Sequence, residues 1–117
     1  MRGELLYMGP LASDPLEAAA DFHARLLPSI EATLMSGADP LTIVFEPANN
    51  AHRAWRLAAV QGLARRFTPA RVNALAAAGL AAAEREALAA TARWLDENSG
   101  ITGQLLALDG TGVPSVL

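Results

Sequence analysis

Polar side chains that could bind a ligand or move a proton are concentrated in one short segment of this chain, EPANNAH. Glu46, Asn49, Asn50 and His52 bring a carboxylate, two amides and an imidazole into this segment. Together they could hold a small polar ligand or take part in proton transfer. A structural interpretation competes with this one, because an asparagine before an apolar run is a preferred helix N-cap and Glu46 can face solvent. We favour the structural interpretation and keep this ligand corner as the alternative.

Outside this segment the residue types exclude most site chemistry. The chain has no cysteine and no lysine, so it has no disulfide, thiolate or lysine-dependent chemistry. His23 and His52 are too far apart for a metal-ligand motif. We interpret His23 as a partnered histidine on a helix face and Tyr7, the single tyrosine, as a packing residue. The sequence therefore predicts no catalytic residue, no metal site and no cofactor.

Hydrophobic periodicity predicts strands that alternate with helices. The segment Ser13-Asp14-Pro15-Leu16-Glu17 predicts a helix start, with Asp14 as the cap and Pro15 in the first turn. Its apolar stripe includes Leu16 and His23, and Pro28 should kink it. This alternation predicts an α/β fold in which about four parallel strands lie between helical layers, in the order βαβαβαβ. The expected strands are 4–8, 41–45, 70–75 and 101–108, the expected helices are 14–36, 50–66 and 81–97, and a Gly/Pro tail follows.

Composition sets the broad class of the protein. The chain has 117 residues, of which 52% are hydrophobic and 18% charged, which is enough apolar material for one core, so we expect a single domain over residues 1–117. The formal net charge is −3 and arginines are scattered, so we expect no nucleic-acid partner. The longest uncharged apolar run, 72–83, is too short to cross a membrane, and no signal-like segment begins the chain. We therefore expect a cytoplasmic protein.

Several short motifs resemble the second half of short-chain dehydrogenases/reductases. They occur in the family's order and at its spacing, and the last is the most specific. The resemblance implies a truncated Rossmann-like, three-layer fold. The motifs are LLYMG at 5–9, LLPSI at 26–30, TIVF at 42–45, AAVQGL at 58–63, RVNAL at 71–75, and ITGQ at 101–104 with Asp109-Gly110.

The polar residues on which that family depends are replaced here. By the resemblance, the Gly-rich nucleotide-binding half would precede this chain, so the family's pyrophosphate site is not expected. Leu57 cannot depress a tyrosine pKa, and Arg53 cannot exchange a proton near neutral pH. The resemblance therefore implies a protein without the family's reaction or cofactor. The family's two asparagines fall on Leu6 and Tyr7, its serine near Pro47 or Ala48, its tyrosine near Arg53 and its lysine near Leu57.

We expect the chain to associate with copies of itself. The first strand lacks the neighbour it would have in the complete family fold, and the helix 50–66 is apolar on two sides with small residues that permit close helix packing. By the resemblance, subunits pair through the helices 14–36 and 50–66, with a second contact through the last helix and strand. We expect a homo-oligomer, either a dimer or a tetramer. The candidate interface residues are Leu26, Ile30, Trp55, Ala59 and Gly62.

Three functions are compatible with these features. The first is a non-catalytic dehydrogenase-like protein that self-associates and has a structural, regulatory or unknown role. The second is an accessory subunit that docks on a full-length short-chain dehydrogenase. The third is a small-molecule binder or enzyme that uses the corner from Glu46 to His52.

Overall fold

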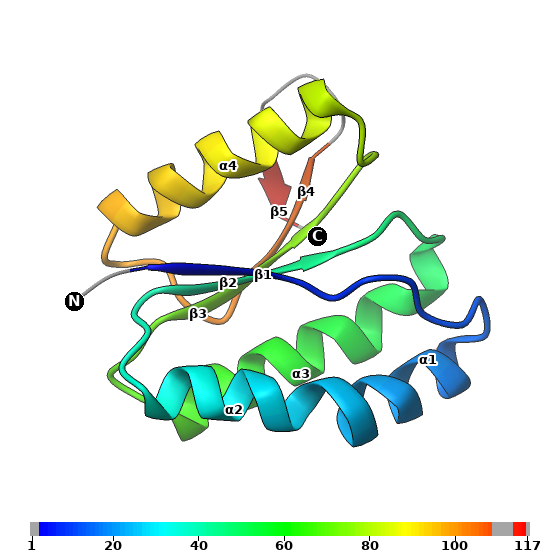
Figure 1. Cartoon of the computed structure of the whole chain (residues 1–117), viewed down its shortest axis with the longest axis horizontal. Helices are drawn as coiled ribbons and strands as arrows, with labels where there is room; N and C mark the ends of the chain where they lie inside the picture. Colours follow the sequence, from blue (N-terminus) through cyan, green and yellow to red (C-terminus); the bar gives the residue numbers. More distant parts are fainter. Residues whose placement is uncertain (1–2, 109–113, 117) are drawn as a thin grey trace.

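A five-stranded sheet forms the centre of the computed structural model, which describes residues 3–108 and 114–116 (Figure 1). The strands lie in chain order, β1 to β4 parallel and β5 antiparallel to β4. The predicted α/β architecture with four parallel strands is confirmed. The elements are β1 (Glu4–Tyr7), α1 (Pro15–Asp21), η1 (Phe22–Leu26), α2 (Leu27–Met35), β2 (Leu41–Phe45), η2 (Asn50–His52), α3 (Arg53–Arg66), β3 (Val72–Ala76), α4 (Ala82–Glu97), β4 (Leu105–Leu108) and β5 (Pro114–Val116).

The strand β5 lies where the sequence predicted only a Gly/Pro tail. It pairs with the outer edge of β4, with Leu106 opposite Val116. A second subunit could reach β4 only by displacing β5. The outer edge of β4 is therefore paired within the subunit, and the expected contact through the last helix and strand stays a prediction.

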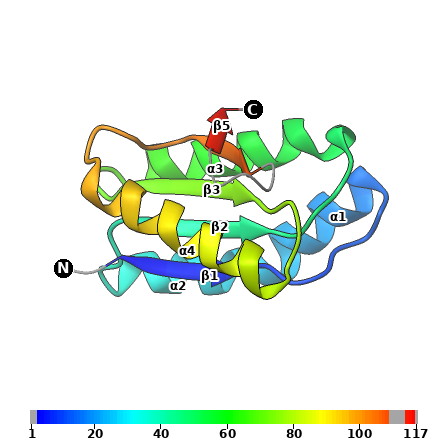
Figure 2. The same cartoon turned by 90° about the horizontal axis from the view of Figure 1, so that it is seen from above.

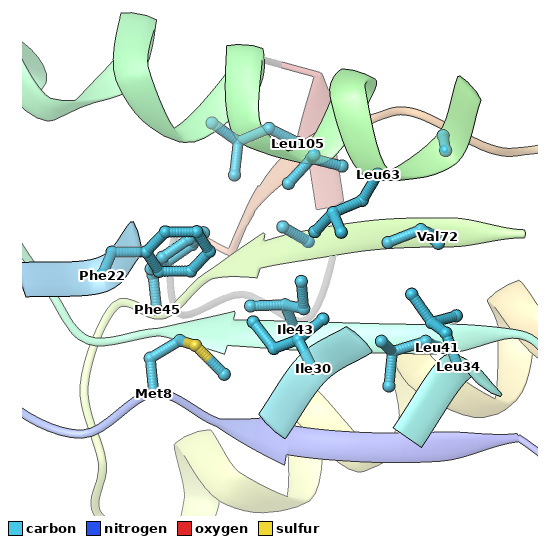
Figure 3. Close-up of a cluster of buried hydrophobic side chains, with 13 residues drawn as sticks. Met8, Phe22, Ile30, Leu34, Leu41, Ile43, Phe45, Leu63, Val72 and Leu105 are labelled. Atoms are coloured by element: carbon cyan, nitrogen blue, oxygen red, sulfur yellow. The ribbon is translucent and has the colours of Figure 1, made fainter. Parts of the chain in front are cut away.

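Helices cover both faces of the sheet, in three layers. The segment from α1 to α2 and the helix α3 pack on one face, and α4 packs on the other (Figures 1 and 2). Every residue of β2 is buried, as expected for a strand that lies inside a parallel sheet. Successive side chains of β2 therefore enter different cores: Ile43 and Phe45 meet Phe22 and Ile30 on the α1–α3 side (Figure 3), whereas Val44 meets Leu88 of α4.

A π-helical turn accommodates Pro28 in the first helical segment. Proline cannot donate a backbone hydrogen bond, and its ring crowds the carbonyl four residues before it. In η1 the N–H of Leu27 instead bonds to the carbonyl of Phe22, five residues back. The wider turn changes the helical register, and His23 is exposed rather than on the apolar side as predicted. Leu16, which precedes the turn, is also exposed, whereas Ile30 and Leu34 of the predicted stripe are buried. The buried residues of this segment are Ala18, Phe22, Ile30 and Leu34.

A buried asparagine joins β3 to the loop before β4. The Asn73 side chain is fully buried; its Nδ2 donates to the carbonyl of Ile101 at 3.0 Å and its Oδ1 accepts from the N–H of Gln104 at 3.1 Å. The hydroxyl of Thr102 also accepts the N–H of Val72 at 3.0 Å. These bonds replace part of a strand ladder, and β4 therefore begins at Leu105 rather than at Ile101 as predicted.

Replacing Asn73 with leucine should destabilise the protein by about 3 kcal/mol, because it leaves the partly buried Ile101 carbonyl and Gln104 N–H without their partners. Urea unfolding monitored by circular dichroism measures this loss. The exposed Asn50 provides the matched control, and Asn50→Leu should change stability by less than about 0.5 kcal/mol. Equal effects of the two substitutions would contradict the role assigned to Asn73.

Candidate functional site

The predicted ligand corner lies at the carboxyl end of β2, where ligands commonly bind in parallel sheets. Glu46 follows Phe45 directly, and Asn49, Asn50 and His52 lead into α3. His52 is only 3% exposed, Glu46 is half-buried, and both asparagines are exposed. The four residues are thus close in the chain but differ in their surroundings.

Both ring nitrogens of His52 are engaged in hydrogen bonds within the protein. Trp55 Nε1 donates to Nδ1 at 3.1 Å, and Nε2 lies 2.9 Å from the carbonyl oxygen of Ser13. Because an indole nitrogen only donates, Nδ1 must accept, so Nε2 carries the proton and donates to Ser13. His52 therefore connects the loop before α1 to the start of α3, and neither nitrogen is left for a ligand.

The other members of the corner also have structural roles. Asn49 Oδ1 accepts the N–H of Ala51 at 2.9 Å, so this asparagine is the cap of η2. Glu46 uses its backbone carbonyl, which accepts a hydrogen bond from Arg56 Nη2 at 3.1 Å. In the part of the chain that the structure describes, the four side chains make no hydrogen bond to one another.

The most unusual polar group near this corner is Arg56, which was not among the predicted site residues. It is only 6% exposed, and its guanidinium carbon lies 4.5 Å from the centre of the Phe45 ring. Among the described residues, Nε has no hydrogen-bond partner and no carboxylate forms an ion pair with the guanidinium. Burial lowers the pKa of Arg56. Arg56 lies four and seven residues before the buried Val60 and Leu63, which places the three on one side of the helix. This spacing is the feature of the sequence that could have indicated its burial.

Two positions that the resemblance connects with catalysis lie on the first turns of α3. Arg53 is exposed and Leu57 is half-buried. The Arg53 guanidinium is therefore open to solvent, and Leu57 offers only an apolar side chain.

Four of the five predicted interface residues are half-buried: Leu26, Trp55, Ala59 and Gly62. Trp55 lies against Phe22 of η1, with ring centres 5.3 Å apart, so this flank of α3 faces the first helical segment. A Cβ atom at Gly62 would meet nothing within 4 Å. Ile30 requires a correction, because it is fully buried against the sheet in the core and cannot contribute to a subunit contact.

Residues 3–108 and 114–116 show neither a cluster of metal ligands nor a membrane-spanning helix. No group of three or more His, Cys, Asp or Glu side chains there is arranged to hold a metal ion. No helix in the same residues has the length and apolar character needed to span a membrane.

Comparison with known proteins identifies one family. A family model described as short chain dehydrogenase-like protein (SDR-like) matches residues 6–108, which include the end of β1, the strands β2 to β4 and all the helices of the described structure. No curated protein and no solved structure gives a significant match.

Replacing Arg56 with methionine should leave the fold intact and raise stability by about 1 kcal/mol, because an apolar side chain of similar length removes a buried charge that lacks a carboxylate partner. Thermal unfolding measures the change. The exposed neighbour Arg53 provides the control, and Arg53→Met should have almost no effect. A loss of about 2 kcal/mol or more in Arg56→Met would show that the charge itself stabilises the fold.

Proposed function

The chain belongs to the short-chain dehydrogenase-like family, and we propose that it is a non-catalytic member that self-associates and has a structural or regulatory role. The observation that carries the proposal is a line of exposed apolar and small residues on the outward side of α1, η1, α2 and α3. The sheet is already covered on this side, so packing within the subunit does not explain this line of residues.

Exposed apolar residues follow one line along the first helical segment. Leu16 at one end is 82% exposed and Met35 at the other is 79% exposed. Between them, exposed small or apolar residues recur every four positions, a spacing that keeps them on one face across the π turn. An aligned apolar surface of this kind is typical of protein contacts. The residues between the ends are Ala20, Ala24, Pro28 and Ala32.

The helix α3 continues this surface with small side chains. Ala54 and Ala58 are exposed, and Gly62 has open space where a side chain would lie. Small residues allow two helix backbones to approach closely. The two-sided apolar character predicted for this helix is consistent with a contact to the sheet on one side and to a second copy on the other.

The side chains described at the ligand corner and on the first turns of α3 support a non-catalytic role. His52 uses both nitrogens within the fold, and Arg53 and Leu57 occupy the positions that the resemblance assigns to the tyrosine and lysine. These groups are poor candidates for the acid-base step of a dehydrogenase.

An accessory role is the second candidate. The same apolar face could dock on the matching helices of a full-length short-chain dehydrogenase instead of on a second copy. Co-purification of such an enzyme with the chain, in place of a self-assembled form, would favour this candidate.

Replacing Gly62 with leucine should weaken self-association while the subunit stays folded, because the new side chain has space in the subunit but blocks a close helix contact. Light scattering after gel filtration measures the mass, and circular dichroism checks the fold. Gly100 also has open space beyond its Cα and provides the control, Gly100→Leu. A wild-type chain that is monomeric at micromolar concentration would contradict self-association.

Nicotinamide cofactors and coenzyme A thioesters should not raise the melting temperature of the protein. A ligand that binds the native state at 100 times its dissociation constant stabilises it by about 2.7 kcal/mol, so binding would be visible in thermal unfolding. A full-length short-chain dehydrogenase provides the positive control. A saturable shift with one of these ligands would restore the small-molecule function as the leading candidate.

A further inference from the structure

The strand β1 has a hydrogen-bonded neighbour on one side only within the described structure. The N–H of Glu4 donates to the carbonyl of Pro40 at 3.0 Å, and that of Met8 donates to the carbonyl of Val44 at 2.9 Å. Because backbone groups alternate in direction along a strand, Leu6 also faces β2, whereas Leu5 and Tyr7 direct their N–H and C=O groups outward. Figure 2 shows β1 at the margin of the sheet.

We propose that two copies of this chain join through their β1 edges in an antiparallel arrangement, which extends the two sheets into one. This inference rests on the proposed self-association and adds a second surface to it, distinct from the helix face. The occupant of the edge is thus the β1 strand of a second copy, related by a two-fold axis through Leu6. An unpaired strand edge is a common site of such pairing.

The register of β1 suits pairing with itself. A two-fold axis at Leu6 places Leu5 of one copy opposite Tyr7 of the other, so the outward backbone groups of both residues find partners. These side chains lie on the α4 side of the sheet, where Tyr7 is 40% exposed and available for a cross-strand contact. Glu4 falls opposite Met8 rather than opposite a second carboxylate, so like charges are not paired.

The flank of α4 above β1 carries opposite charges at its two ends. The guanidinium of Arg85 lies 5.0 Å from the centre of the Tyr7 ring, near the carboxyl end of β1. A carboxylate oxygen of Asp96 lies 3.2 Å from the position of a Cβ on Gly3, near the amino end. Arg93 lines the same cavity as Glu4 and Asp96, so this amino end keeps a net negative charge. Antiparallel pairing brings Arg85 of one copy toward that end of the other. This charge complementarity favours a second copy as the occupant.

The flank of α2 below β1 is compatible with a close neighbour (Figure 2). Glu31 pairs with Arg66 of α3, so the opposite flank of α2 faces the β1 margin. That flank carries Ser29, Thr33 and Ser36, which are small residues. Their hydroxyls donate to carbonyls of their own helical segment at 2.9–3.0 Å, so none of them needs another partner when a second helix approaches.

Amide hydrogen exchange of the wild-type chain tests the proposal directly. At concentrations where light scattering shows assembly, the amides of Leu5 and Tyr7 should exchange at least about tenfold more slowly than in the dilute monomer, while Leu6 stays protected in both states. Rapid exchange of Leu5 and Tyr7 in the assembled protein would overturn the edge pairing. That result would leave self-association through the helix face intact.

The substitution Leu5→Pro provides a second test, with Leu5→Val as its control. The N–H of Leu5 faces outward, so proline keeps the bonds to β2 and removes a donor only from the edge. Leu5→Pro should reduce the assembled mass measured by light scattering, and Leu5→Val should not. An unchanged mass for folded Leu5→Pro would refute edge pairing but not self-association through the helix face. A monomeric wild type would refute both proposals. If Leu5→Pro does not fold, the amide exchange of Leu5 and Tyr7 in the wild type decides whether the β1 edges pair.

Discussion

Burial of the central strands on both faces is the constraint on which the rest of this structure depends. Every residue of β2 and most of β3 are inaccessible to water, so each face of the sheet must be covered by helices. The helix α4 covers one face, and the segment from α1 to α2, together with α3, covers the other. This requirement determines which side of each helix packs on the sheet, where Phe22 and Leu88 must point, and why both layers are needed within so short a chain.

The same constraint explains why the polar residues at the carboxyl end of the sheet are used for structure. The loop before α1 has to pass over this end, and His52 holds it there through the carbonyl of Ser13. Arg56, which lies on the buried side of α3, satisfies one of its donors with the Glu46 carbonyl and stacks on Phe45. His52 and Arg56 thus use their polar groups for internal contacts in a region where α/β sheets commonly bind ligands.

Local sequence signals predicted the secondary-structure elements well where those elements depend on interactions between residues close in the chain. Asp14 and Asn49 cap their helices as expected, because a cap depends on a few adjacent backbone groups. The four parallel strands and the three main helical segments also followed from periodicity.

The exposure of His23 could not be predicted in this way, because the π turn before Pro28 changes the helical register, and periodicity assumes a regular helix. The late start of β4 depends on Asn73, whose partners are about thirty residues away in the chain. The burial of Arg56 depends on contacts with Phe45 and Glu46 across the fold, and the pairing of β5 with β4 is likewise long-range.

A fold and the chemistry performed on it can depend on different residues, and the proposed non-catalytic role requires such a separation. The strands and helix contacts need side chains of suitable volume and polarity, such as Val60, Asn73 and Leu105, whose roles are to pack or to satisfy backbone groups. Proton transfer needs a few titratable groups at positions where packing demands little. Arg53 and Leu57 lie at such positions on α3, one exposed and one half-buried, so the fold tolerates their side chains at little cost in stability. Under the proposed self-association, the exposed apolar residues from Leu16 to Met35 would form part of the contact surface.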